Sequence, residues 1–209
     1  MIINPGVMRD ELLAHAVRAA SAHGLKSLSI GEMAREFAIP KSRLFTMFAS
    51  NAALQLAVLD HAAAMFAREV IAAVPEDMPA ERRVSALFAR WLDWSRSLRL
   101  KSGCPFVHAS AEGEDLPDDV HRKLRETLDH WSGVLRTAID DAKANGAMRR
   151  DLETDQFVFE LYGLYLSHHF WHWSMKDPSA RARTMKAFER LYRDALTAPG
   201  RLQQPPNAA

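Results

Sequence analysis

Apolar residues recur every three or four positions along most of the chain, and almost no stretch alternates apolar with polar residues over the length of a strand. The first spacing is that of one face of an α-helix, whereas alternation is typical of a half-buried strand. With 9 glycines and 10 prolines, residues that interrupt helices are sparse. The pattern predicts an all-α protein of about nine helices.

Three predicted helices lie close together at the N-terminus. The first covers about 8–23, the second begins at Ser29, and the third covers 41–48. Ser29 and Glu32 have the spacing of a capping box, in which each residue satisfies a free backbone N–H of the other. Two short helices joined by a tight turn, with a longer helix before them, predict a helix-turn-helix head over residues 1–50.

The rest of the chain carries longer helical patterns. We expect helices over about 51–73, 80–98, 105–111, 117–145, 154–175 and 178–196. Residues 51–198 should therefore form a helical bundle. The proline-rich tail 199–209 is expected to be disordered, because it can bury little apolar surface.

Charge and cysteine content exclude several classes of protein. Lys plus Arg total 27 and Asp plus Glu total 26, so the net charge of +1 excludes a protein that binds nucleic acid by bulk charge. Cys104 is the single cysteine, which excludes an internal disulfide and favours a reducing compartment. No stretch reads as a signal peptide or a membrane span. We expect a cytoplasmic protein with no membrane partner.

The third predicted helix carries the most informative chemistry. Leu44 and Phe48 would anchor its inner face to the head. Its outer face would present side chains that can reach phosphates and base edges: Lys41, Ser42, Arg43 and Thr46. Spacing alone leaves two interpretations, a DNA-reading helix or an ordinary helical hairpin with a solvated polar face.

The stretch from Leu12 to Leu59 resembles the N-terminal domain of the TetR family of transcriptional repressors. The resemblance rests on these residues: Gly24, Ser29-Ile30, Met33-Ala34, Ala38-Ile39-Pro40, Leu44-Phe45-Thr46-Met47-Phe48, Ser50-Asn51 and Leu54. It implies a homodimeric regulator that binds a double-stranded DNA operator and is released from it by a small-molecule effector. The implied DNA contacts are Ser29, Lys41, Ser42, Arg43, Phe45, Thr46 and Asn51.

Three positions depart from the family pattern. Phe45 stands in place of a tyrosine, Met47 in place of a histidine, and Asn51 in place of a lysine. Each change removes a contact that positions the protein on the DNA backbone. The chain therefore binds an unusual operator, binds DNA weakly, or is a dimeric helical ligand-binding protein whose head no longer reads DNA.

Residues 157–173 place bulky apolar groups on every side of a helix. Such a helix must be buried all round, which predicts packing on a second copy, with a deeply buried helix in a monomer as the alternative. The final helix adds its own apolar stripe. We expect the dimer interface to contain Leu161, Leu164, Tyr165, His168, Trp171, His172, Met185, Phe188, Leu191 and Tyr192.

The family resemblance also implies a small-molecule pocket in the C-terminal bundle. Its candidate residues are Trp91, Trp94, Cys104, Phe106, His108, Trp131, Phe159 and Tyr162. Core packing explains most of these residues equally well. Histidines 168, 169 and 172 have a spacing that could hold a metal, but packing at an interface is the favoured interpretation, so we expect no metal and no cofactor. No motif of a known enzyme class is present, and we expect no catalytic site.

Overall fold

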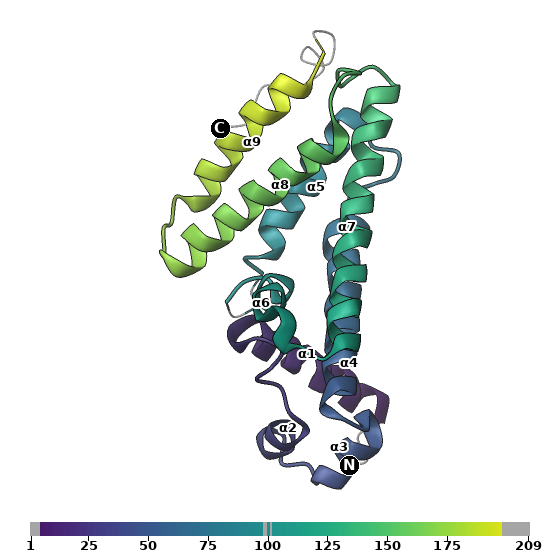
Figure 1. Cartoon of the computed structure of the whole chain (residues 1–209), viewed down its shortest axis with the longest axis vertical. Helices are drawn as coiled ribbons and strands as arrows, with labels where there is room; N and C mark the ends of the chain where they lie inside the picture. The colour runs from purple at the N-terminus through teal and green to yellow at the C-terminus, as the bar shows by residue number, and fades with distance from the viewer. Residues whose placement is uncertain (1–4, 98–99, 101, 198–209) are drawn as a thin grey trace. The chain divides into compact units, whose positions relative to one another are not determined.

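The computed structural model describes residues 5–97, 100 and 102–197. Within these residues the predicted all-α class is confirmed (Figure 1). The nine α-helices are α1 Pro5–His23, α2 Ile30–Glu36, α3 Lys41–Phe48, α4 Asn51–Phe66, α5 Ala80–Trp94, α6 Pro105–Glu112, α7 Asp118–Ala144, α8 Thr154–His169 and α9 Ala180–Ala195. None of these described helices combines the length and the apolar run that crossing a bilayer requires.

The helix boundaries agree with the sequence pattern except at three places. The predicted helices 51–73 and 154–175 both change to π-helical geometry near their ends, over Ala67–Ile71 and Phe170–Ser174. Helix α5 stops at Trp94, and the expected end of that helix at Leu98 lies outside the described residues, as does the tail 199–209.

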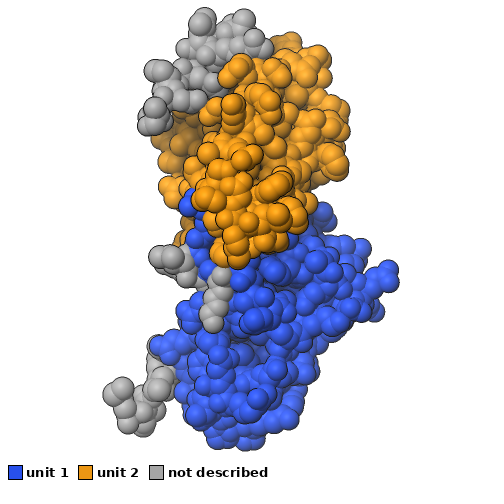
Figure 2. Space-filling model, turned by 90° about the vertical axis from the view of Figure 1, so that its left-hand side faces the viewer, with its two compact units in different colours: residues 1–67, 95–129 blue, residues 68–94, 130–209 orange. Residues whose placement is uncertain are grey.

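The chain divides into two compact units (Figure 2). Unit 1 comprises the chain up to Ala67 together with Ser95–Asp129, and unit 2 comprises Arg68–Trp94 and the chain from His130 onward. The predicted boundary at residue 50 therefore does not separate the units. Helix α4, which follows that boundary, packs against α1 and belongs to the same unit as the head.

Capping and apolar burial explain the helices of the head. The inward stripe of α1 is 0–2% exposed at Leu12, Leu13, Ala16, Val17 and Ala20. Burial of each large side chain contributes roughly 1.5–3 kcal/mol, enough to fix how α1 packs on its neighbours. The N-termini of α2 and α4 are capped by serine side chains, which accept hydrogen bonds from the backbone three residues ahead: Ser29 from Glu32 N at 3.1 Å and Ser50 from Ala53 N at 3.1 Å.

Unit 2 is held by an aromatic core among α5, α8 and α9. Helices α8 and α9 run side by side in opposite directions, and α5 contacts both (Figure 1). Phe88 of α5 stacks on Phe188 of α9 with ring centroids 4.5 Å apart. A β-bridge between Met148 and Leu196 joins the α7–α8 loop to the end of α9.

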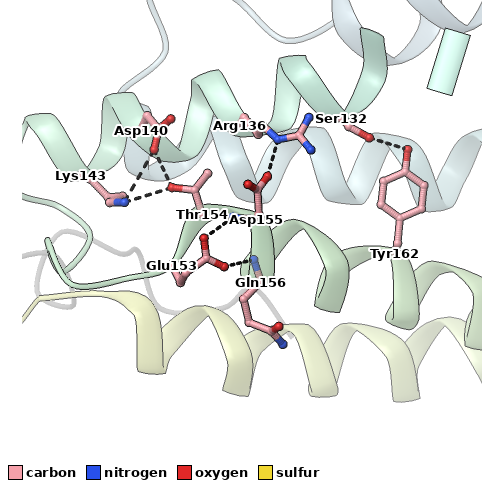
Figure 3. A network of polar contacts seen from close by, with 9 residues as sticks. All are labelled: Ser132, Arg136, Asp140, Lys143, Glu153, Thr154, Asp155, Gln156 and Tyr162. Atoms are coloured by element: carbon pink, nitrogen blue, oxygen red, sulfur yellow. Dashed lines mark hydrogen bonds and ion pairs between the residues drawn. The ribbon is translucent and has the colours of Figure 1, made fainter. Parts of the chain in front are cut away.

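Polar contacts fix the position of α8 along the second half of α7 (Figure 3). Arg136 Nε pairs with Asp155 Oδ1. Lys143 Nζ donates to Thr154 Oγ1 at 3.0 Å, and that hydroxyl donates to Asp140 Oδ1 at 2.6 Å. These contacts join the first turn of α8 to the second half of α7.

Candidate functional site

Helix α3 presents the two faces that the sequence predicts. Leu44 is 0% exposed and Phe48 is 4% exposed, so both anchor the helix to the head. The residues expected on the outer face are all exposed, namely Lys41, Ser42, Arg43 and Thr46, and Phe45 is exposed beside them. The helix contains no acidic residue, so its outer surface carries the positive charges of Lys41 and Arg43.

Contacts on this face orient two of its side chains. The Lys41 ammonium lies over the Phe45 ring, 5.6 Å from its centroid. A cation over an aromatic face is attracted by the ring quadrupole, so Phe45 holds Lys41 in place although it lacks a hydroxyl. The Thr46 hydroxyl donates to the Ser42 carbonyl oxygen at 3.0 Å, which leaves the Thr46 oxygen free to accept from another group.

Two of the predicted DNA contacts also serve the head internally. Ser29 caps α2 through Glu32 N, and its hydroxyl donates to the Glu32 carboxylate at 3.2 Å. Asn51, at the start of α4, accepts a hydrogen bond from the backbone N–H of Ile30 at 3.0 Å. The side-chain oxygen of Asn51 therefore ties α4 to α2, a role that its position in the sequence did not reveal.

The predicted pocket residues are divided between the two units. Cys104, Phe106 and His108 belong to unit 1. Cys104 is 2% exposed, and Phe106 contacts Phe66 edge-on with centroids 6.1 Å apart. His108 Nε2 lies 3.3 Å from the carbonyl oxygen of Ser102. These side chains form part of the packing of α6 in unit 1.

The other pocket candidates lie in unit 2 and mostly pack on one another. The Trp91 ring stacks on Tyr165 at 4.0 Å and meets Trp131 and Tyr162 edge-on at 5.2 and 4.8 Å. The Tyr162 hydroxyl lies 3.2 Å from Ser132 Oγ (Figure 3). Rings in such close contact fill the space between them, as expected of a packed core. Trp94, at 2% exposure, is equally buried.

Phe159 corrects the pocket prediction. Its side chain is 72% exposed, so it lies on the surface of unit 2 and lines no enclosed cavity. Gly163 and Leu166, one and two turns further along α8, are exposed as well. Residues four and seven positions apart share one helix face, which identifies this as the outward face of α8.

The list of residues predicted for the dimer interface needs a similar correction. Among the expected interface residues, the following are at most 2% exposed within the single chain: Leu161, Tyr165, His168, Phe188 and Tyr192. They pack inside unit 2 and have no surface to offer a second copy. Leu164, His172, Met185 and Leu191 are partly exposed, and Trp171 is 45% exposed. The sequence showed that α8 is apolar all round but not which of its faces meets its own core.

The large apolar side chains that do reach the surface gather on α8 and the turn after it. Apart from Phe45, those exposed within the described chain lie between residues 159 and 175: Phe159, Leu166, Phe170, Trp171 and Met175, at 45–72%. We call these five residues the exposed apolar face. Isolated apolar residues on a surface are ordinary, whereas a contiguous apolar patch is typical of a contact region.

The histidines of this segment pack rather than converge. His168 is 0% exposed, and its ring stacks on His172 with centroids 5.5 Å apart. Within the part of the chain that the structure describes, no three side chains of the metal-binding types lie close enough to hold an ion.

A family model described as "Tetracyclin repressor-like, C-terminal domain" matches residues 80–188, more than half of the chain. The chain belongs to the TetR family. Helices α5 to α8 and most of α9 lie within the matched region, and the TetR-like head precedes it. A comparison with curated protein sequences gave no match.

Solved structures show the same TetR fold. A TetR transcriptional regulator from Chloroflexus aurantiacus is 17% identical with a TM-score of 0.78, covering 90% of this chain and 93% of its own. SCO4454 from Streptomyces coelicolor is 24% identical with a TM-score of 0.76, covering 92% and 91%. AibR, solved with isovaleryl coenzyme A and operator DNA, is 16% identical with a TM-score of 0.68, covering 87% and 96%.

Sequence reasoning missed one residue that links the TetR head to α6. The Glu112 carboxylate, at the end of α6, accepts from the backbone N–H groups of Leu25 and Lys26 at 2.9 and 3.0 Å. Lys26 also pairs with Asp115 at 2.8 Å, and this hydrogen bond and charge lower the pKa of the Asp115 carboxyl. The contact joins residues more than 80 positions apart, so no local pattern could have predicted it.

Proposed function

We propose that this TetR-family protein is a homodimeric, sequence-specific DNA-binding repressor of transcription. The observation that carries the proposal is the outer face of α3, which is basic, exposed and free of acidic residues, on a helix anchored by Leu44 and Phe48. In a helix-turn-helix, the second helix enters the major groove with its first residues at the base edges. Lys41, Ser42 and Arg43 are the first three residues of α3.

The roles of these side chains follow from their chemistry. Arg43 can donate two hydrogen bonds to the edge of a guanine and so contributes sequence recognition. Lys41, held over Phe45, meets phosphate, and Thr46 accepts or donates at a base edge or the backbone. AibR, which shares the fold, was solved on operator DNA, and this likeness supports the same placement of the head.

Selection of bound duplexes from a random DNA pool tests the proposal. A dimer should enrich a pseudo-palindrome whose half-sites are separated by about one helical turn or a multiple of it. Affinity for that duplex should fall with rising salt, because phosphate contacts release counterions. If folded protein enriches no sequence, the operator-binding function is wrong.

Arg43→Ala provides the residue-level prediction. We expect it to weaken binding to the selected duplex by about tenfold to a hundredfold and to relax the preference at one base position. Arg150→Ala, an exposed arginine in the loop after α7, is the matched control and should leave binding unchanged. Titration by fluorescence anisotropy measures both; equal losses in the two variants would contradict the placement of α3.

The second copy would pack on the exposed apolar face of α8. Phe159, Leu166 and Phe170 follow one line along the helix, with Gly163 between them, where an added Cβ would meet nothing within 4 Å. A line of large side chains beside a small residue suits close packing of a two-fold related helix. Dimerisation would then supply the symmetry that paired half-sites require.

A small molecule bound by the C-terminal helices would release the repressor from DNA. It can do so only by binding the DNA-free arrangement more tightly than the DNA-bound one. Linkage then requires the operator to lower the affinity for the effector by the same factor. The Glu112 contact to Leu25 and Lys26 offers a route, because a shift of α6 would act directly on the segment between α1 and α2.

One observation favours a second function, a dimeric ligand-binding protein whose head does not read DNA. The Asn51 oxygen and the Ser29 hydroxyl, both expected at the DNA backbone, are engaged inside the head. Phe45 also lacks the hydroxyl with which a tyrosine at this position could contact the DNA backbone. Under this alternative, binding to duplex DNA would show neither a sequence preference nor an effect of Arg43→Ala.

A further inference from the structure

A groove of about 350 Å³ lies between α5 and α9, within unit 2. Its apolar walls include Met78, Ala86, Met185 and Phe188. This volume lies at the lower end of the range for small-molecule sites. None of the residues predicted for the effector pocket lines this groove, and Met185, Phe188 and Tyr192, expected at the dimer interface, line it instead.

A buried hydroxyl and an acidic side chain line the groove together. Tyr192 is 2% exposed, and its hydroxyl forms no hydrogen bond within the described residues. Glu81, in the first turn of α5, is 9% exposed and lines the same groove. Burial raises the pKa of the Tyr192 phenol, and the negative charge of Glu81, which lines the same groove, raises it further.

Leaving the Tyr192 hydroxyl unpartnered is costly. A buried hydroxyl without a hydrogen bond destabilises the folded protein, because it has lost its bonds to water and gained none in their place. Native proteins leave few such groups, and each calls for an explanation. A bound species that supplies hydrogen bonds to the Tyr192 hydroxyl and charge to the Glu81 carboxylate would be such an explanation.

The chemistry of Glu81 and Tyr192 indicates which kind of ligand the groove would bind. A carboxylate only accepts hydrogen bonds, and a phenol oxygen can accept one as well. An ammonium group donates up to three hydrogen bonds, and its positive charge complements the negative charge of Glu81. Arg82 and Arg193 also line the groove, but both are exposed, so solvent screens them more than it screens the buried Glu81.

We propose that the α5–α9 groove binds a small organic ammonium ion, with its N–H groups on Glu81 and Tyr192 and its apolar part against Met185 and Phe188. As the effector site of a repressor, this assignment rests on the function proposed above. As a binding site, it stands alone, because no DNA is needed to test it.

Calorimetry of the full-length protein with 2-phenylethylammonium and hexylammonium tests the site. We expect saturable binding of at least one amine, and much weaker binding of 2-phenylethanol and hexanol, which lack the charge. Glu81→Gln should weaken amine binding about tenfold or more, and Tyr192→Phe about threefold to tenfold. Glu76→Gln, an exposed glutamate just before α5, is the matched control and should bind as the wild type does.

Thermal unfolding separates loss of the site from loss of the fold. Tyr192→Phe removes only an unpartnered oxygen, so its melting temperature should equal or exceed that of the wild type. No binding of either amine up to about 1 mM, or binding unchanged in both groove variants, overturns the proposal. If the protein binds an amine but enriches no DNA sequence, the ammonium site stands and only the repressor function is wrong. If it enriches a DNA sequence but binds no amine, the repressor function stands and the ammonium site is wrong.

Discussion

Glu112 shows how one side chain can define a long-range contact. Its carboxylate accepts from two backbone N–H groups, and the backbone at Gly24, just before them, has φ of +80°. A Cβ added at Gly24 would lie 2.1 Å from Glu112 Oε1. Glycine is required here for two independent reasons, the left-handed backbone and the close approach of the carboxylate.

Gly24→Ala therefore tests the Glu112 contact. Gly146 has the same φ of +80°, but an added Cβ there would meet nothing within 4 Å. Gly146→Ala should cost about 1–2 kcal/mol for the backbone alone. Gly24→Ala should cost about 1–3 kcal/mol more, because Glu112 must withdraw from its hydrogen bonds. Chemical denaturation measures both; equal losses would show that the Glu112 contact adds nothing to stability.

Tyr192 predicts a change in stability at alkaline pH. In the unfolded chain the phenol ionises near pH 10. In the folded protein burial raises its pKa well above that value, so the proton is kept. The unfolded state alone loses the proton as pH rises above about 10, and stability then declines. The free energy of unfolding should fall less steeply above that pH in Tyr192→Phe than in the wild type; parallel curves would contradict the burial.

At the scale of elements, the serine caps and apolar stripes act as the sequence indicates, but contacts between helices add new roles. Ser29 and Ser50 begin α2 and α4 through bonds to residues three positions ahead, a spacing visible in the chain. The Asn51–Ile30 bond spans 21 positions and joins those same two helices. Only the packed head brings its two ends together.

Two substitutions at Asn51 separate its structural role from a role in DNA binding. Asn51→Ala removes the acceptor for Ile30 N–H and should cost about 1 kcal/mol of stability. Asn51→Asp keeps the acceptor and should keep stability, but its negative charge should weaken DNA binding about tenfold at low salt. Denaturation and anisotropy titrations measure the two effects; unchanged DNA affinity in Asn51→Asp would place α4 away from the phosphate backbone.

At the scale of the whole molecule, we expect copies of the chain to assemble through the exposed apolar face. We expect a dimer of about 47 kDa, twice the chain mass of 23.5 kDa. Phe159→Glu places a charge in the proposed contact and should weaken dimerisation about a hundredfold or more. Light scattering coupled to gel filtration should then give a mass near that of one chain.

Phe45→Glu is the matched control for assembly. Phe45 is 45% exposed, but it belongs to α3 and not to the exposed apolar face. The same substitution there should leave the dimer intact while it weakens DNA binding, because the new carboxylate would face phosphate. A monomeric Phe45→Glu protein, or a dimeric Phe159→Glu protein, would contradict the proposed interface.

The sequence by itself determined the helical class, the helix-turn-helix and the family resemblance. Each depends on local information, namely the 3.6-residue period, capping residues and turn residues, which are set by neighbours within a few positions. This is why Lys41 and Arg43 could be assigned to the outer face of a short helix in advance.

The tertiary structure decided which apolar residues meet which surface. Trp91, Trp131 and Tyr162 proved to be packed on one another, Phe159 proved to be exposed, and Tyr192 proved to line a groove. When a helix is apolar on every side, its local sequence does not indicate which face packs against the protein core. That face is fixed by the helices packed beside it. The same packing brings Glu112 to Leu25 and Lys26 and places Glu81 and Tyr192 on one groove, although these residues lie far apart in the chain.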